Sequence, residues 1–207
     1  SIDGDMGIKG RTSTVGVEFS DVWDNLQGVV TVRFSTLYKK KFGFLFDYNY
    51  LDLGSDQLTH AGNIDVGFKS QIINLGGTYR FMDGQHSIDG LAGIRYTKLE
   101  ASLDFNDFGV SIDGDQDWVD PIIGLRYSYQ ISDMWSLRLY GDIGGFGVSS
   151  DFTWQGLGLI SLQPWKNVAF VAGYRGIGTD YETGSRLNKF TYDTTVHGPI
   201  IGLDIRW

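Results

Sequence analysis

Apolar and polar residues alternate one by one along most of this chain, and short polar segments interrupt the alternation. The pattern is clearest in the C-terminal segment GPIIGLDIRW, whose apolar positions are Ile201, Leu203, Ile205 and Trp207. Successive side chains of a β-strand point to opposite faces, so a period of two predicts strands with one apolar face and one polar face.

The alternation predicts about ten strands, with about eight as the conservative number. They are expected over residues 27–38, 42–54, 64–82, 86–103, 117–131, 135–149, 151–164, 167–180 and 189–207, with at least one more within 1–19. The sequence leaves open whether 1–19 forms one strand or a bent pair. The segment SDVWDNL, residues 20–26, is expected to form a short helix at or in one mouth of the fold, because Ser20 or Asp21 can serve as its N-cap.

The segments between these strands alternate in length. YKKKF, FMDGQH, QISDMW and LQPWKN are short, whereas LGSDQLTHAGN, DFNDFGVSIDGDQD and YETGSRLNKF are longer. Short turns at one end and long loops at the other are typical of outer-membrane β-barrels. We therefore expect an all-β fold in which residues 1–207 form a single domain, a closed antiparallel transmembrane up-and-down β-barrel.

The polar face of the expected strands is rich in arginine and aspartate. Several strands carry an arginine between two apolar or aromatic residues, as in VRF, YRF, IRY and LRY. An arginine that faces lipid near the midplane of a membrane costs about 2–4 kcal/mol, so a spanning sheet must turn these residues inward. The residues predicted to line the lumen are Arg33, Asp47, Arg80, Asp89, Arg95, Arg126, Arg138, Asp142, Arg175, Asp204 and Arg206.

This charged set has two interpretations. As structure, it is a paired polar core that plugs a narrow barrel, because side chains nearly fill a barrel of about eight to ten strands. As function, it lines a narrow pore in which the excess of arginine favours small anions. We favour the plug.

A soluble ligand-binding barrel, with its apolar face inside, is the alternative arrangement. Two features argue against it. Tyr and Trp residues gather near the strand ends, as they do where strands meet a membrane interface. The charged face combines Arg and Asp with Gly, Ser, Thr and Asn, whereas a solvated sheet would carry more Lys and Glu.

Composition narrows the classes of function. The 29 Gly, the 3 Pro and the aromatic content of 14% fit many strands joined by tight turns. A net charge of -8 argues against a nucleic-acid partner. The absence of Cys excludes disulfides, thiolate chemistry and Cys-ligated zinc, and no cofactor is predicted. The chain opens at Ser1 without a Met, so we expect a mature or trimmed form, in which an export signal cannot be observed.

Catalysis has little support in the sequence. A lipid-modifying enzyme at the barrel rim would need a His close to a Ser or a carboxylate. His197, Asp193 and Ser185 are the residues that could meet in this way. We predict no catalytic residues and expect His197 to be a hydrogen-bonded residue of the lumen or the interface.

The segment DGDQD carries a weak candidate metal site. Asp113, Asp115 and Asp117 have the spacing that begins an EF-hand loop. The pattern then fails, because Trp118 stands at the position of the turn glycine and Gly124 at that of the bidentate Glu. We expect a solvated acidic outer loop, with weak divalent-cation binding that bridges to anionic lipopolysaccharide as the alternative.

The C-terminal strand and several internal segments carry a family resemblance. An alternating apolar strand that ends in an aromatic residue is the assembly signal of bacterial outer-membrane proteins, and Ile201, Leu203, Ile205 and Trp207 match it, with Trp in place of the usual Phe. Four segments, preceded by SDVWDNL, extend the match: DWVDPIIGLRY (117–127), YGDIGGFGVSSDFTW (140–154), GYRGIGTDYE (173–182) and HGPIIGLDIRW (197–207).

With these segments the chain resembles a widespread group of uncharacterised proteobacterial outer-membrane β-barrel proteins. The similarity runs over most of the chain, and GDIGGFG is its most specific part. The resemblance implies a location in the bacterial outer membrane and carries no activity with it.

We therefore expect a non-enzymatic outer-membrane β-barrel with a charged, largely plugged lumen and a structural, accessory or docking role in the envelope. A narrow passive channel for small anionic solutes and a lipid-modifying enzyme at the rim are the alternatives. The expected partners are outer-membrane lipid and lipopolysaccharide, the barrel-assembly machinery during biogenesis, and an envelope protein.

Overall fold

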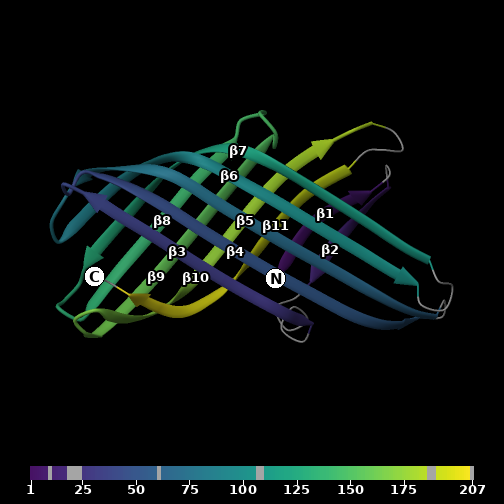
Figure 1. The fold of residues 1–207 in the computed structure, drawn as a ribbon, viewed down its shortest axis with the longest axis horizontal. Coiled ribbons are helices and arrows are strands. Elements are labelled where there is room, and N and C mark those ends of the chain that lie inside the picture. The colour runs from purple at the N-terminus through teal and green to yellow at the C-terminus, as the bar shows by residue number, and fades with distance from the viewer. Residues whose placement is uncertain (9–10, 18–24, 60–61, 106–109, 186–189, 206–207) are drawn as a thin grey trace.

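The computed structural model of this chain consists of β-strands joined by short connections (Figure 1). It describes residues 1–207 except 9–10, 18–24, 60–61, 106–109, 186–189 and 206–207. The strands are β1 (Ile2–Ile8), β2 (Arg11–Val17), β3 (Leu26–Tyr38), β4 (Phe42–Thr59), β5 (Gly62–Met82), β6 (His86–Phe105), β7 (Val110–Gln130), β8 (Trp135–Gly145), β9 (Phe152–Trp165), β10 (Val168–Thr183) and β11 (Phe190–Ile205).

All of these strands belong to one antiparallel sheet. From β3 to β11 each strand pairs with the next along the chain, β11 then pairs with β1, and β1 pairs with β2. The sheet curls through 231° as a half-barrel, with β2 and β3 at its two edges. The predicted all-β, antiparallel, up-and-down arrangement is therefore confirmed. In Figure 1 the wall of β3 to β6 crosses the wall of β8 to β11 obliquely.

Residues 1–19 contribute two short strands rather than one. β1 and β2 pair from Ile2↔Val17 to Ile8↔Arg11, and β1 also pairs along β11. The short helix expected over 20–26 lies outside the described residues, except for its last two positions.

Strands β4 to β7 are longer than the sequence predicted. The segments LGSDQLTHAGN and DFNDFGVSIDGDQD were expected as loops, yet β4 and β5 pair continuously to Thr59↔Gly62, and β6 and β7 pair to Phe105↔Val110. The prediction of long loops is wrong at these two places. Continuous cross-strand pairing outweighs the weak β-propensity of the Ser, Asp, Asn and Gly residues in these segments.

Tight turns join the strands at the opposite end of the sheet. In the β3–β4 turn, Lys39 and Lys40 adopt φ angles of 49° and 55°, and the amide of Lys41 donates a hydrogen bond to the carbonyl of Tyr38 at 3.1 Å. Two successive left-handed residues match the twist of antiparallel strands in a hairpin. We call the end that holds this turn and the β5–β6, β7–β8 and β9–β10 turns the turn end, and the other end the loop end.

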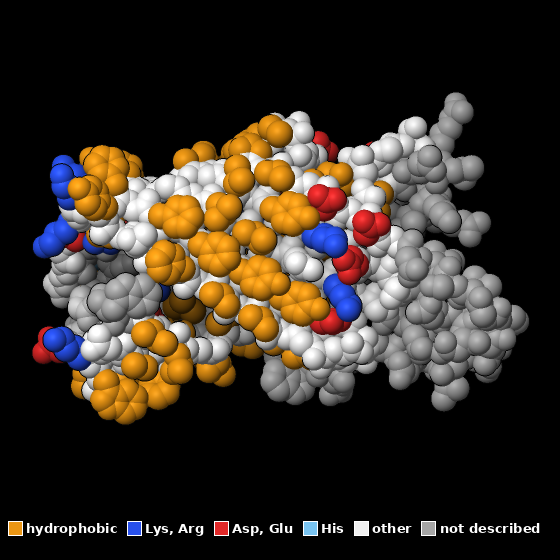
Figure 2. Space-filling view, in the orientation of Figure 1, with side chains coloured by type: hydrophobic (Ala, Val, Ile, Leu, Met, Phe, Trp, Pro, Cys, Tyr) orange, Lys and Arg blue, Asp and Glu red, His pale blue; other side chains and the backbone are white. Residues whose placement is uncertain are grey.

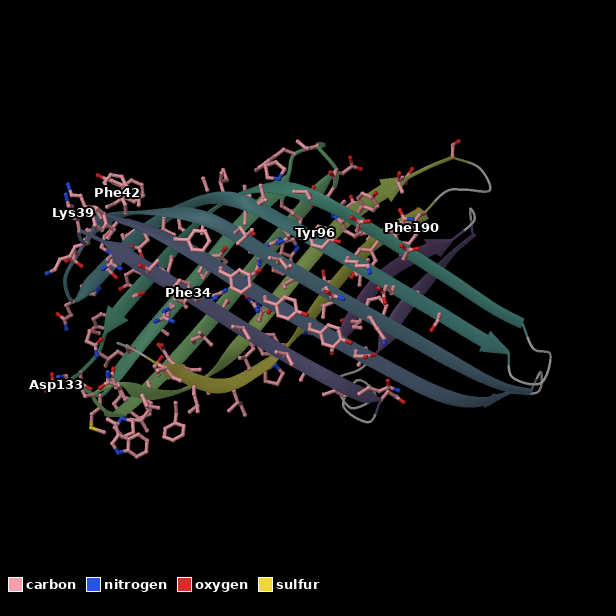
Figure 3. All side chains as sticks on the ribbon, in the orientation of Figure 1. Phe34, Lys39, Phe42, Tyr96, Asp133 and Phe190 are labelled. Carbon is pink, nitrogen blue, oxygen red and sulfur yellow. The ribbon has the colours of Figure 1, made fainter. Side chains whose placement is uncertain are left out.

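The convex face of the sheet is apolar and aromatic. Figure 2 shows hydrophobic side chains spread over it as a band, and Figure 3 shows Phe34 and Tyr96 among them. Leu125 and Ile201 are 59% and 87% exposed. Other large exposed residues of this apolar band are Val32, Phe44, Tyr79, Ile94, Ile123, Leu139, Ile143, Phe170, Tyr174 and Leu203.

A row of charged residues borders the apolar band on the loop-end side of β4 to β7 (Figure 2). Asp52 lies opposite Lys69, Lys69 opposite Glu100, and Glu100 opposite Asp115. Lys69 Nζ lies 3.5 Å from Asp52, and Lys98 Nζ lies 2.6 Å from Glu100. The exposed surface therefore changes from apolar to charged along the length of these strands.

Two clusters of apolar side chains lie inside the curl. The first cluster holds Leu45, Leu91, Ile122, Tyr140, Leu157 and Leu159, with Ile200 packed against it. The second holds Leu99, Trp118, Tyr181 and Tyr192, with Phe68 and Phe190 packed against it. The rings of Trp118 and Tyr181 stack with centroids 4.0 Å apart. Since these residues come from strands on both walls, the interior is packed and not merely enclosed.

Candidate functional site: the charged interior

Arg95 lies at the centre of a buried polar network. It enters the interior from β6 and is 0% exposed. Its guanidinium donates hydrogen bonds to Asn74 at 2.8 Å, Thr153 at 2.8 Å and Asp142 at 2.7 Å. A further bond reaches Gln155 at 3.1 Å. A buried charge is tolerated only when it is paired and hydrogen-bonded, and the Arg95 guanidinium meets both conditions.

A second group of charges links opposite walls of the sheet. Arg175 on β10 donates hydrogen bonds to Asp47 and Asn49 on β4, which lies six strands away in the order of the sheet. Arg33 on β3 donates to the same Asp47 at 2.8 Å, and its guanidinium lies 5.0 Å from the ring centroid of Tyr140. Asp47 is fully buried and serves two arginines. These contacts form because the sheet curls around a common interior.

A third group lies nearer the turn end, where Asp89 is shared by two arginines. Arg80 donates to Asp89 at 2.7 Å, and Arg126 donates to the other carboxylate oxygen at 2.7 Å. Arg80 also pairs with Asp83 of the β5–β6 turn at 3.0 Å. Asp89 is 1% exposed, and the two guanidinium groups supply the counter-charge and the hydrogen bonds that a buried carboxylate requires.

The residues predicted to line the lumen are thus brought together in ion-paired groups. All of those that the structure describes are buried or half-buried, on the face opposite the apolar band. Arg206 lies outside the described residues. Sequence reasoning missed the neutral partners Asn49, Asn74, Thr153 and Gln155. The only sequence signal for these residues is that they alternate with outward-facing residues. A neutral polar side chain in such a position does not by itself indicate burial.

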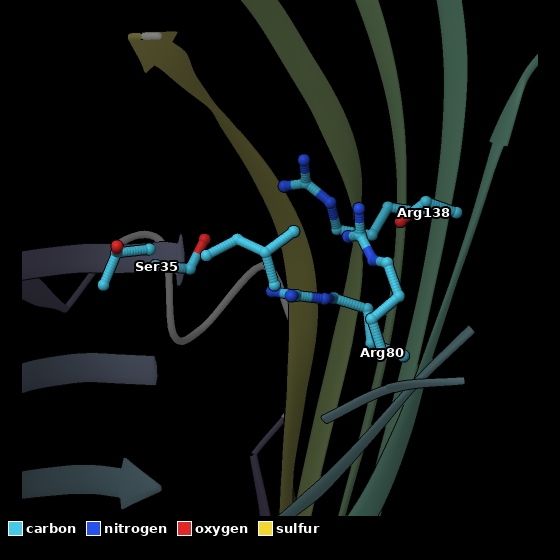
Figure 4. A pocket seen from close by; sticks show the side chains of 7 residues that line it. Ser35, Arg80 and Arg138 are labelled. Atoms are coloured by element: carbon cyan, nitrogen blue, oxygen red, sulfur yellow. The ribbon is translucent and has the colours of Figure 1, made fainter. Parts of the chain in front are cut away.

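A cavity of about 160 Å³ opens between the edge strand β3 and the strands across from it, near the turn end (Figure 4). Arg138 on β8 forms part of its wall and makes a 3.5 Å ion pair with Asp204 on β11. The polar residues that line the cavity are Ser35, Thr36, Arg80, Arg126, Ser128 and Arg138. The cavity therefore combines guanidinium and hydroxyl groups from four strands.

His197 has different partners from those that the sequence suggested. Its Nε2 lies 3.1 Å from the carboxylate of Asp3, and its Nδ1 is hydrogen-bonded to the hydroxyl of Tyr174. Asp193 lies four residues along the same strand, about 13 Å away. Ser185 lies beyond the end of β10. His197, Asp193 and Ser185 therefore do not form a catalytic group.

His86 has aromatic partners and no catalytic arrangement among the described residues. His86 stacks on Tyr129 with centroids 4.5 Å apart, and its Nδ1 is hydrogen-bonded to the hydroxyl of Tyr127 at 2.7 Å. These rings lie at the turn end of β6 and β7. His60 lies outside the described residues.

The acidic segment DGDQD lies within strand β7 and not in a loop, which corrects the prediction. Asp115 and Asp117 are exposed on the convex face, opposite Glu100 and Lys98. Asp113 also belongs to β7. Within the described part of the chain, no group of three His, Cys, Asp or Glu residues could hold a metal ion.

The predicted assembly signal lies on the last strand. Ile201, Leu203 and Ile205 are 87%, 61% and 62% exposed on the convex face of β11, close to the turn end. Trp207 lies outside the described residues. The three described residues therefore extend the apolar band to the C-terminal part of the sheet.

No protein-family model matches the chain, and no curated protein matches its sequence. Over the residues that are described, no helix is long and apolar enough to cross a membrane.

Proposed function

We propose that this chain is a non-enzymatic β-barrel of the bacterial outer membrane, with a charged and largely plugged lumen and a structural or docking role in the envelope. The observation that carries the proposal is the contrast between the two faces of the sheet. Large apolar side chains are exposed on the convex face, whereas paired charges are buried on the concave face. Soluble monomers rarely expose an apolar patch beyond a few hundred Å².

The proposal includes closure of the sheet into a barrel. β2 and β3 lie at opposite edges of an antiparallel sheet, yet they run in the same direction and follow each other in the chain. The link from Val17 to Leu26 spans at most about 30 Å, whereas the edges of a flat sheet of this size would lie about 48 Å apart. We therefore infer that β2 and β3 are two halves of one strand position, which gives a barrel of about ten positions.

Closure is also what a lipid environment requires. Each backbone N–H or C=O group left unpaired in hydrocarbon costs several kcal/mol, so an open edge does not persist there. The cross-wall contacts of Arg175 with Asp47 and Asn49 support the same arrangement, because they hold β10 and β4 at a fixed separation.

The packed interior favours a plug over a channel. Asp47, Arg95 and Ile122 are at most 1% exposed, and they come from three different strands. The first apolar cluster joins β4 to β9 across the same region. A water-filled path through the barrel would require these side chains to separate.

Solubility tests the membrane assignment. The purified chain should remain monodisperse only in detergent or lipid, and its migration on a gel should change on boiling, because a closed barrel resists unfolding by detergent at room temperature. In cells, it should fractionate with the outer membrane. A monodisperse monomer in plain buffer, with its aromatic residues shielded from water, would contradict the proposal.

A further inference from the structure

The cavity near the turn end is lined by three arginines and, among the described residues, by no acidic side chain. Ser35, Thr36 and Ser128 also line it, and Ser35 and Ser128 share the strand faces of Arg33 and Arg126. The carboxylates that pair with the arginines are Asp83, Asp89 and Asp204, and none of them belongs to the lining. Positive charge therefore faces the cavity, while the compensating negative charge lies behind it.

Arg80 and Arg138 both line the cavity (Figure 4), together with Arg126. Arg126 holds Asp89 through Nε and Nη2, at 2.9 and 2.7 Å, and no hydrogen bond engages its Nη1 among the described residues. Arg138 donates to Asp204 through Nη2 at 3.5 Å. The side chains of Arg80, Arg126 and Arg138 are 19%, 12% and 28% exposed. Arg80 donates to Asp83 and Asp89 through Nε, Nη1 and Nη2, so it would contact a ligand only through the second N–H of Nη1 or Nη2.

We propose that this cavity binds a phosphate group, held by Arg80, Arg126 and Arg138. Guanidinium groups bind phosphate oxygens through pairs of N–H donors. Three guanidinium groups on three strands, with hydroxyl groups facing them, match an anion whose oxygens point in several directions. A planar carboxylate has only two oxygens and would leave part of this donor set unused.

The phosphate group is either the free ion or part of a larger molecule such as a lipid headgroup, since the cavity recognises the chemistry that both share. The inference goes beyond the proposed structural role. It also does not depend on the membrane assignment, because it rests only on the cavity and the ion pairs behind it.

Calorimetric titration tests the inference, with the full chain refolded in uncharged detergent and inorganic phosphate as the probe. We expect saturable binding of one phosphate per chain. Arg138→Gln should lower the affinity by about tenfold or more, because charge-assisted hydrogen bonds are lost. Lys166→Gln is the matched control: it removes the same charge at the turn end but outside the cavity, and should change the affinity by less than about twofold.

A second variant keeps the test decisive if Arg138→Gln does not refold. Ser128→Ala removes a hydroxyl from the cavity without breaking an ion pair, and should weaken phosphate binding about threefold. A comparison of inorganic phosphate with glycerol phosphate distinguishes the two sources: tighter binding of the ester assigns the cavity to a phosphate on a larger molecule, and tighter binding of the free ion assigns it to free phosphate.

Three results would each overturn the inference. The first is the absence of binding up to roughly 30 mM phosphate. The second is an equal loss of affinity in Arg138→Gln and Lys166→Gln, which would indicate attraction by overall charge. The third is acetate binding as tightly as phosphate, which would remove the argument from the geometry of the anion.

Discussion

Arg95 illustrates how a single residue keeps a charge in an interior that water does not reach. A guanidinium has five N–H donors, and four side chains accept hydrogen bonds from this one. Asp142 supplies the counter-charge, and its side chain is also fully buried. Because neither ion can be solvated, removal of one leaves the other without compensation.

Replacement of Arg95 by Met should therefore lower the free energy of unfolding by about 3–5 kcal/mol. Urea unfolding of the protein refolded into lipid vesicles measures the loss. The double variant with Arg95→Met and Asp142→Leu should recover most of it, since no buried charge then remains. A single variant within about 1 kcal/mol of the unmodified chain would mean that water reaches Asp142.

Among the elements, the β8–β9 connection depends on its neighbour β7. Gly145 and Phe146 both adopt positive φ angles, 87° and 53°, as the chain leaves β8. The buried carboxylate of Asp120 accepts hydrogen bonds from the Ser150 amide at 2.8 Å, the Ser150 hydroxyl at 2.5 Å and the Trp118 indole at 3.0 Å. A left-handed phenylalanine costs about 1–2 kcal/mol, so these bonds help to hold a turn that is unfavourable by itself.

Asp120→Ala should free this turn and lower the free energy of unfolding by about 2–3 kcal/mol, because hydrogen bonds to a charged acceptor are lost. Limited digestion of the folded protein with chymotrypsin should then cleave after Phe146, an exposed residue. Asp133→Ala, in the exposed β7–β8 turn, serves as the control and should leave the digestion pattern unchanged. Equal resistance of Asp120→Ala and the unmodified chain would show that the turn is held by other contacts.

Three aspartates face one another across β1, β11 and β10. Asp5 lies opposite Asp193, and Asp193 lies opposite Asp180, all three exposed on the convex face. Like charges directly opposite each other destabilise a sheet by about 0.2–1 kcal/mol. Asp193→Asn should therefore raise the free energy of unfolding by up to about 1 kcal/mol, and by less at high salt.

The same urea titration at low and high salt measures this effect, with Asp133→Asn as a control that removes a charge elsewhere. A loss of stability in Asp193→Asn would indicate that this carboxylate has a favourable role that the repulsion conceals.

For the molecule as a whole, the alternation of apolar and polar residues predicted the sheet and its two faces. It did not predict the full length of strands β4 to β7. The motif IRY predicted that the Arg95 side chain points to the face opposite that of Ile94 and Tyr96, because the direction of a side chain in a strand follows from local alternation. Pairing is not local: the partners of Arg95 lie up to 60 residues away in the chain. Neutral Asn74 and Gln155 carry no mark of burial in the sequence. The cavity depends on the curvature that brings β3 towards β8, and no alternation specifies that curvature.

Planar bilayers that contain the refolded protein should show no stepwise conductance, because Asp47, Arg95 and Ile122 fill the middle of the interior. The double variant with Arg95→Ala and Asp142→Ala, which removes a central part of the plug, should admit ions and produce current steps. Steps from the unmodified chain, with an anion preference reduced by Arg126→Gln, would favour the channel.

The pairing of β1 with β11 joins distant parts of the chain, since Ile2 lies opposite Val196. A growing polypeptide therefore cannot form this pairing until residues 191–196 have been translated. Prematurely terminated products would carry unmatched backbone along β1 and β10, and a protease could recognise them by that defect alone. The connectivity itself thus distinguishes finished molecules from unfinished ones.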